Sequence, residues 1–147
     1  MEEKVLLAKP IKEHMFTQLN TKISEIKQPL KLVVFQIDPT PESQIFLASK
    51  QRLAKQLGIL CEVIHYSIST SEEQIIARIE KLNKDHSVTG IMIQKPIPSK
   101  YDYQNLIDHI EPKKDVEGVT KSQQQTQTLI APTAHSVLAF IEYYHIP

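Results

Sequence analysis

Lys50 is the first residue whose type and setting suggest chemistry. It ends the stretch QIFLASK at positions 44–50, which continues as QRLAKQLG to position 58 and has the pattern of a helix. On a helical wheel, Lys50 shares one face with three apolar residues, Phe46, Leu53 and Leu57. We expect this face to be the buried one. A lysine in it either extends its ammonium group to water or is held for proton transfer.

Gln94 is the second such residue, at the end of an apolar run that predicts a strand over residues 88–94. Its amide offers two hydrogen-bond donors and an acceptor. The segment KPIP follows, and its prolines, Pro96 and Pro98, cannot continue a central strand because proline has no N–H. The motif therefore predicts either a rigid wall beside a pocket or a plain strand terminator.

Two carboxylates, Asp115 and Glu117, lie in the segment EPKKDVEG at positions 111–118, which reads as a loop ended by a glycine. Carboxylates in loops are usually solvated. The same side chains can also bind a polar ligand, and the residues alone leave both interpretations open. No serine or cysteine nucleophile lies in a recognisable elbow motif.

The elements that must position these residues alternate along the chain. Apolar runs predict strands over residues 31–38, 59–68 and 88–94, and helical patterns cover residues 9–28, 43–57, 74–84, 103–110 and 135–145. The polar tract at 121–128 is predicted to be an exposed loop. This alternation predicts an α/β fold, a mainly parallel βαβ sheet flanked by helices in three layers, as a single domain over residues 1–147. Ligands of such sheets bind at the carboxyl ends of the strands.

Composition excludes several classes of protein. The net charge is zero and the pI is near 7, so a nucleic-acid-binding surface is not supported. One cysteine and scattered histidines give no disulfide and no metal site. The lack of a long apolar run or signal peptide predicts a cytoplasmic protein without membrane association. Only three glycines occur, too few for a Gly-rich phosphate-binding loop.

Three segments together resemble one enzyme family. SQIFLASK, VTGIMIQKPIP and IEPKKDVEG follow each other in the order and at the spacing of conserved blocks in the bifunctional methylenetetrahydrofolate dehydrogenase/methenyltetrahydrofolate cyclohydrolase family. The resemblance covers nearly the whole chain and implies the N-terminal catalytic domain only. It also implies that the C-terminal Rossmann domain, which binds NADP in this family, is absent from these residues. A homodimer is expected only of a full-length protein.

The resemblance implies roles for the singled-out residues. In this family the enzyme oxidises 5,10-methylenetetrahydrofolate to the methenyl cation and hydrolyses that cation to 10-formyltetrahydrofolate. The lysine that matches Lys50 transfers the protons, and the glutamine that matches Gln94 holds it. The acid at Glu117, in the loop with Asp115, would bind the pterin. The remaining residues of the folate slot would be Phe46, Pro96 and Pro98.

The chain departs from the family pattern at some of these positions. Phe46 replaces a tyrosine, Glu117 replaces an aspartate, and Lys95 replaces a leucine. We expect a folate enzyme that runs at most the hydrolysis as an isolated chain, because hydride transfer requires the cofactor domain that the resemblance implies is absent. The substituted residues motivate the alternative, a catalytically inactive folate-binding or regulatory domain. A phospho-acceptor signalling domain is disfavoured, because its acid would stand where this chain has Gln94.

Overall fold

The computed structural model describes residues 6–126 and 129–146. The chain divides into two compact units. The sheet unit comprises Gln28–Leu129, and the described part of the two-helix unit is residues 6–27 and 130–146. The predicted site residues all belong to the sheet unit, so this unit alone carries the geometry that follows.

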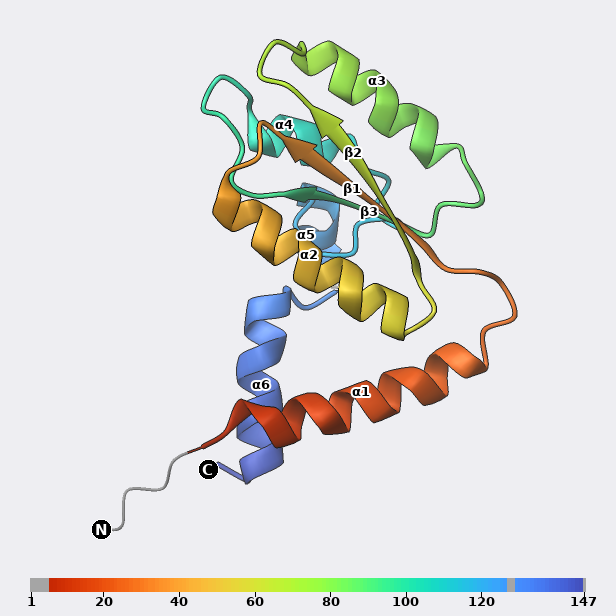
Figure 1. Cartoon of the computed structure of the whole chain (residues 1–147), viewed down its shortest axis with the longest axis vertical. Helices are drawn as coiled ribbons and strands as arrows, with labels where there is room; N and C mark the ends of the chain where they lie inside the picture. Colours follow the sequence, from red (N-terminus) through yellow and green to blue (C-terminus); the bar gives the residue numbers. More distant parts are fainter. Residues whose placement is uncertain (1–5, 127–128, 147) are drawn as a thin grey trace. The chain divides into compact units, whose positions relative to one another are not determined.

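Three parallel strands form the sheet in the order β2-β1-β3 (Figure 1). They are β1 Lys31–Ile37, β2 Leu60–Tyr66 and β3 Gly90–Gln94. β1 lies in the middle, and its apolar run is buried from its third residue onward because both faces are covered. The prediction of a parallel sheet with helices on both sides is confirmed.

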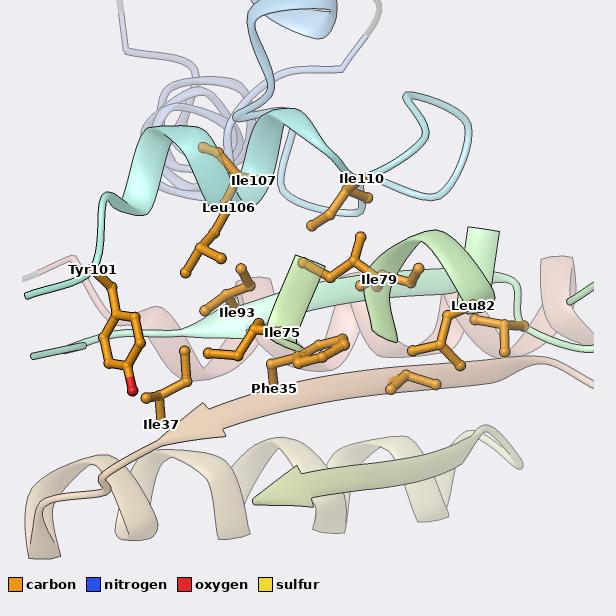
Figure 2. Close-up of a cluster of buried hydrophobic side chains, with 13 residues drawn as sticks. Phe35, Ile37, Ile75, Ile79, Leu82, Ile93, Tyr101, Leu106, Ile107 and Ile110 are labelled. Carbon is orange, nitrogen blue, oxygen red and sulfur yellow. The ribbon is translucent and has the colours of Figure 1, made fainter. Parts of the chain in front are cut away.

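Two hydrophobic clusters attach the helices to the two faces. On one face, α3 (Glu72–Asn83) and α4 (Tyr103–Asp108) bury their apolar side chains against β1 and β3, as Figure 2 shows. On the other face, α2 (Pro41–Gln56) packs Leu47 against Val34 and Met92. The members of the larger cluster that Figure 2 labels are Phe35, Ile37, Ile75, Ile79, Leu82, Ile93, Tyr101, Leu106, Ile107 and Ile110.

Local sequence signals fix the ends of the helices. α3 begins with a capping box: the Ser71 side chain accepts from the backbone N–H of Gln74, and the Gln74 side chain accepts from that of Ser71. Thr40 caps α2 in the same way by accepting from the N–H of Ser43. Gly58 follows α2 with a φ of 71°, the left-handed conformation that ends helices.

The prediction of an exposed loop over residues 121–128 is wrong for its described part. Lys121–Thr126 form the helix α5, and residues 127–128 lie outside the described residues. Gln123 is buried, and its Nε2 donates to the carbonyl of Pro112. This hydrogen bond to a residue 11 positions earlier holds the tract against the rest of the sheet unit, which composition alone does not reveal.

The two-helix unit consists of α1 (Ala8–Ser24) and α6 (Pro132–Tyr144). The Tyr144 hydroxyl joins them: it accepts from the backbone N–H of Leu7 at 2.9 Å and donates to its carbonyl at 2.8 Å. A groove of about 520 Å³ between the helices is lined by residues such as His14, Gln18 and Tyr143. None of the predicted site residues lines it.

Candidate functional site

Lys50 and Gln94 meet at the carboxyl end of the sheet. The Nζ of Lys50, on α2, donates to Oε1 of Gln94, the last residue of β3, at 2.9 Å. Gln94 is 7 % exposed, and its Nε2 donates to the carbonyl of Lys95 at 2.6 Å. A half-buried amine is thus held by an amide that is itself fixed to the backbone.

The predicted buried face of α2 is wrong at Phe46 and Leu53, which are 65 % and 38 % exposed, and is confirmed at Leu57, which follows the helix and is 8 % exposed. The residues that α2 itself buries are Ser43, Leu47 and Ala54. The helix is oriented by Leu47, which packs on the sheet, so Phe46 faces outward. Lys50 lies at the margin of the buried face, which explains how its amine reaches Gln94 and stays accessible. The exposed ring of Phe46 is one turn of α2 before Lys50.

Asp115 is an internal anchor of its loop. It is 2 % exposed, and its carboxylate accepts the backbone N–H groups of Glu117, Gly118 and Thr120 at 2.9–3.0 Å. This bonding wraps the loop around one buried carboxylate and holds Glu117 in place. The predicted contact of Asp115 with a substrate stays a prediction. In the structure, both of its carboxylate oxygens accept hydrogen bonds from the loop.

The loop lies directly against the sheet. The N–H of Ile91 donates to the carbonyl of Lys114 at 2.8 Å, and Ile91 forms a bridge with Asp115. A Cβ atom at Gly90 would collide with the side chain of Val116, so only glycine permits this approach. The close packing keeps Glu117 near the end of β3.

Charged groups surround Glu117. Burial raises the pKa of Glu117 above its ordinary value, while the charges of Lys50 and Lys95 act in the opposite direction and Asp115 raises it further. These couplings place Glu117 within electrostatic reach of both lysines. The structure therefore brings together Lys50, Gln94 and Glu117, from α2, β3 and the 115–118 loop.

Tyr103 is a neighbour of the site that the sequence analysis did not identify. The Nζ of Lys95 lies 3.7 Å from the centre of its ring, a cation–π contact. Burial, with smaller contributions from Glu117 and Asp115, raises the pKa of Tyr103 to about 12. No motif in the sequence marks this tyrosine, because its relevance depends on where α4 starts relative to β3.

The prolines lie on the segment that leaves the sheet. Pro96 is exposed and joined to Lys95 by a cis peptide bond, and Pro98 is half-buried. The carbonyl of Pro98 accepts from the N–H of Tyr101 at 3.1 Å, which turns the chain toward α4. Lining of a ligand slot by Pro96 and Pro98 stays a prediction.

Gln36 is a second polar residue that the sequence analysis did not single out. It is 1 % exposed near the carboxyl end of β1, and the register pairs it with Gln94. The only feature of the sequence that could have pointed to Gln36 is the presence of a glutamine inside the apolar run KLVVFQI.

Among residues 6–126 and 129–146, no cluster of three His, Cys, Asp or Glu side chains is arranged to hold a metal ion. No helix in that part of the chain is long and apolar enough to cross a membrane.

The sequence of this chain is similar to those of known proteins. The model of the family described as "Tetrahydrofolate dehydrogenase/cyclohydrolase, catalytic domain" matches residues 6–117. The "Bifunctional protein FolD" of Lactobacillus helveticus is 32 % identical over 98 % of this chain and 54 % of its own length. The "Bifunctional protein FolD 2" of Lactobacillus johnsonii is 33 % identical over 95 % of this chain and 51 % of its own length.

Solved structures are similar over the same extent. The bifunctional 5,10-methylenetetrahydrofolate dehydrogenase/cyclohydrolase of Thermoplasma acidophilum superposes with a TM-score of 0.91 at 27 % identity, over 97 % of this chain and 53 % of that one. A 5,10-methylenetetrahydrofolate dehydrogenase of the silkworm Bombyx mori gives 0.85 at 26 % identity, over 95 % and 50 %. The chain thus spans about half the length of the relatives that it matches.

Proposed function

This chain belongs to the tetrahydrofolate dehydrogenase/cyclohydrolase family, and from that premise we propose that its sheet unit binds a folate and hydrolyses 5,10-methenyltetrahydrofolate to 10-formyltetrahydrofolate. The observation that carries the proposal is the 2.9 Å hydrogen bond from Lys50 to Gln94 at the carboxyl end of the sheet. This is the region where parallel sheets bind ligands. The pair provides a proton-transferring amine whose position is fixed by an amide.

The hydrolysis needs a proton removed and later returned. Water attacks the amidinium carbon of the methenyl cation, and its proton passes to the neutral amine of Lys50. The resulting ammonium group then protonates the departing ring nitrogen as the carbon–nitrogen bond breaks. The hydroxyl group that came from the water loses its proton to solvent as its oxygen forms the C=O bond, which leaves the formyl group on the other nitrogen. Because Lys50 donates a hydrogen to Gln94 Oε1, the lone pair of its neutral amine stays free to accept the proton.

Glu117 and Phe46 supply the binding contacts in this proposal. The Glu117 carboxylate accepts hydrogen bonds from the N–H groups of the pterin, and its anchored loop holds it in position. The exposed ring of Phe46 stacks on the flat face of the ligand. Pro96 and Pro98 limit the slot on the side of β3.

NADP does not fit the residues of this chain. A dinucleotide is held by a Gly-rich turn between a strand and a helix, and each of the three glycines has another place in the fold. Gly58 ends α2, Gly90 lies under Val116, and Gly118 belongs to the loop around Asp115. We therefore propose no hydride-transfer step for these 147 residues. Oxidation of 5,10-methylenetetrahydrofolate would need the Rossmann domain that the family resemblance implies.

The test is the decay of methenyltetrahydrofolate absorbance with the purified chain. We expect decay above the buffer rate, and a loss of about 100-fold or more in Lys50→Met, since general acid–base groups contribute 10²–10⁴-fold. The matched control is Lys55→Met, an exposed lysine on the same helix, which should keep the full rate. Equal decay in the unmodified chain and in buffer would contradict the proposal.

A second candidate function is folate binding without turnover. Its specific support is Phe46, which lacks the hydroxyl of the family's tyrosine, and Lys95, which adds a positive charge beside Glu117 near a cationic substrate. In this case, the chain would quench or shift a folate spectrum on titration and leave the methenyl chromophore intact. Homodimerisation of a full-length protein and a cytoplasmic location remain predictions.

A further inference from the structure

Gln36 is a buried polar side chain in the middle strand of the sheet. Its exposed fraction is 1 %. Neither Nε2 nor Oε1 of its amide has a hydrogen-bond partner among the residues that the structure describes. Native proteins rarely bury an amide in this way, because the lost bonds to water are not replaced. A glutamine kept in the centre of the sheet needs a reason other than packing.

The sheet places Gln36 beside the Lys50–Gln94 pair. The register of β1 and β3 pairs Gln36 with Gln94. Paired residues of neighbouring strands project their side chains to the same face. Two residues earlier on β1, Val34 lies on this face and packs against Leu47 of α2. Gln36 is therefore under α2, next to the amide that Lys50 contacts.

Gln94 has hydrogen-bonding capacity that matches what Gln36 offers. An amide oxygen has two lone pairs and an amide nitrogen has two hydrogens. Gln94 uses one lone pair for Lys50 and one hydrogen for the carbonyl of Lys95. One lone pair and one hydrogen remain. Gln36 has both its donors and its acceptor available within the described part of the chain.

We propose that Gln36 is a positioning residue whose amide bonds to Gln94 through one buried water and fixes which way the Gln94 amide faces. The direction matters because a flip of the Gln94 amide would turn its NH₂ group toward Lys50, so that two donors would face each other. Gln36 holds the oxygen toward Lys50 and so keeps the amine in its reacting position. The inference rests on the proposed function, which makes Lys50 the proton carrier.

The first experiment compares the side-chain amide signals of Gln94 in nuclear magnetic resonance spectra of the unmodified chain and Gln36→Met. Methionine has a similar length but no hydrogen-bonding amide, so we expect the Gln94 signals to shift or broaden. Unchanged Gln94 signals in a folded variant would overturn the proposal.

Gln123→Met is the matched control, since it makes the same change at another buried glutamine. Gln123 donates to the carbonyl of Pro112, so this variant should lose stability and leave the Gln94 signals in place. If Gln36→Met lowers stability as Gln123→Met does and leaves Gln94 unmoved, Gln36 has only a structural role.

Lys50→Met provides a second arm that does not depend on the folding of the Gln36 variant. Removing the amine frees the lone pair of Gln94 Oε1, so the amide signals of Gln36 should move as well. Unmoved Gln36 signals would count against the connection.

Kinetics separate this inference from the proposed function. In an active chain, Gln36→Met should lower kcat by up to about 100-fold with little change in KM, the size expected of a misplaced reacting group. A change confined to KM would overturn the positioning role. If the unmodified chain hydrolyses nothing, the proposed function fails, and the spectra alone decide the role of Gln36.

Discussion

At the scale of single residues, the site is a small set of charged groups, of which Asp115 is buried and Lys95 is exposed. The charges of Lys50, Lys95 and Asp115 all act on the pKa of Glu117 near the end of β3. Only Asp115 is fully enclosed, and it is satisfied by three backbone N–H groups. Glu117, unlike Asp115, has a carboxylate that is free to contact a ligand in the proposed site. The protonation of Glu117 is therefore the property to measure first.

We expect Glu117→Gln to stabilise the chain at neutral pH. Burial raises the pKa of Glu117, so its ionised form is disfavoured in the folded state. The stability linked to this group is fully present below the ordinary value of 4.5 and is lost as the pH rises through the folded pKa. The gain in the free energy of unfolding should therefore vanish in acid, when Glu117 is protonated. Urea unfolding at pH 4 and pH 7 measures it.

Glu73→Gln is the control with the opposite sign. Backbone and Ser71 hydrogen bonds at the start of α3 lower the pKa of Glu73. Its contribution to stability is present above the ordinary pKa and lost in acid, so this substitution should destabilise at pH 7. A Glu117→Gln variant less stable than the unmodified chain at neutral pH would show that the carboxylate is stabilised in its charged form.

At the scale of elements, the 115–118 loop matters as much as the helix that carries Lys50. Its contact with β3 requires Gly90, and its turn requires Gly118 at a φ of 65°. Asp115 stabilises this loop by accepting hydrogen bonds from backbone N–H groups of the loop itself. The position of Glu117 is thus a consequence of a buried carboxylate two residues earlier.

Asp115→Asn should destabilise the chain by about 1–3 kcal/mol, the cost of an unsatisfied buried donor. The Asp115 Oδ2 accepts from Thr120, and an NH₂ group in its place would oppose that N–H. Urea unfolding gives the change, and Asp85→Asn is the matched control. Asp85 caps an exposed turn through Ser87 and should cost less. Equal losses would mean that burial of Asp115 adds nothing.

At the scale of the whole molecule, the larger hydrophobic cluster supports the surface on which the site is built. Ile79 of α3 is fully buried in that cluster (Figure 2). Ile79→Ala should lower the free energy of unfolding by about 2–5 kcal/mol, as expected for a cavity in a core. Ile45→Ala, at a residue that is 68 % exposed, should change it by less than about 0.5 kcal/mol. Similar unfolding midpoints for the two variants would contradict this assignment of the core.

Much of this arrangement was accessible from the sequence. The three apolar runs and the helical patterns predicted strands and helices that the structure contains. The interpretation of α2 failed because the wheel shows which residues share a face but not which face meets the sheet. The tract at 121–126 was missed because its helix depends on contacts such as Gln123 with Pro112.

By itself, the sequence determined the parallel α/β architecture and the family of this chain, because hydrophobic periodicity and short motifs are local properties of the polymer. Only the tertiary structure decided how the residues are used. It turned Phe46 outward, gave the Asp115 carboxylate to its own loop, and brought Gln36 beside Gln94. These outcomes depend on strand register and on which helix face packs against the sheet, and both are set by contacts between residues that are distant in the chain.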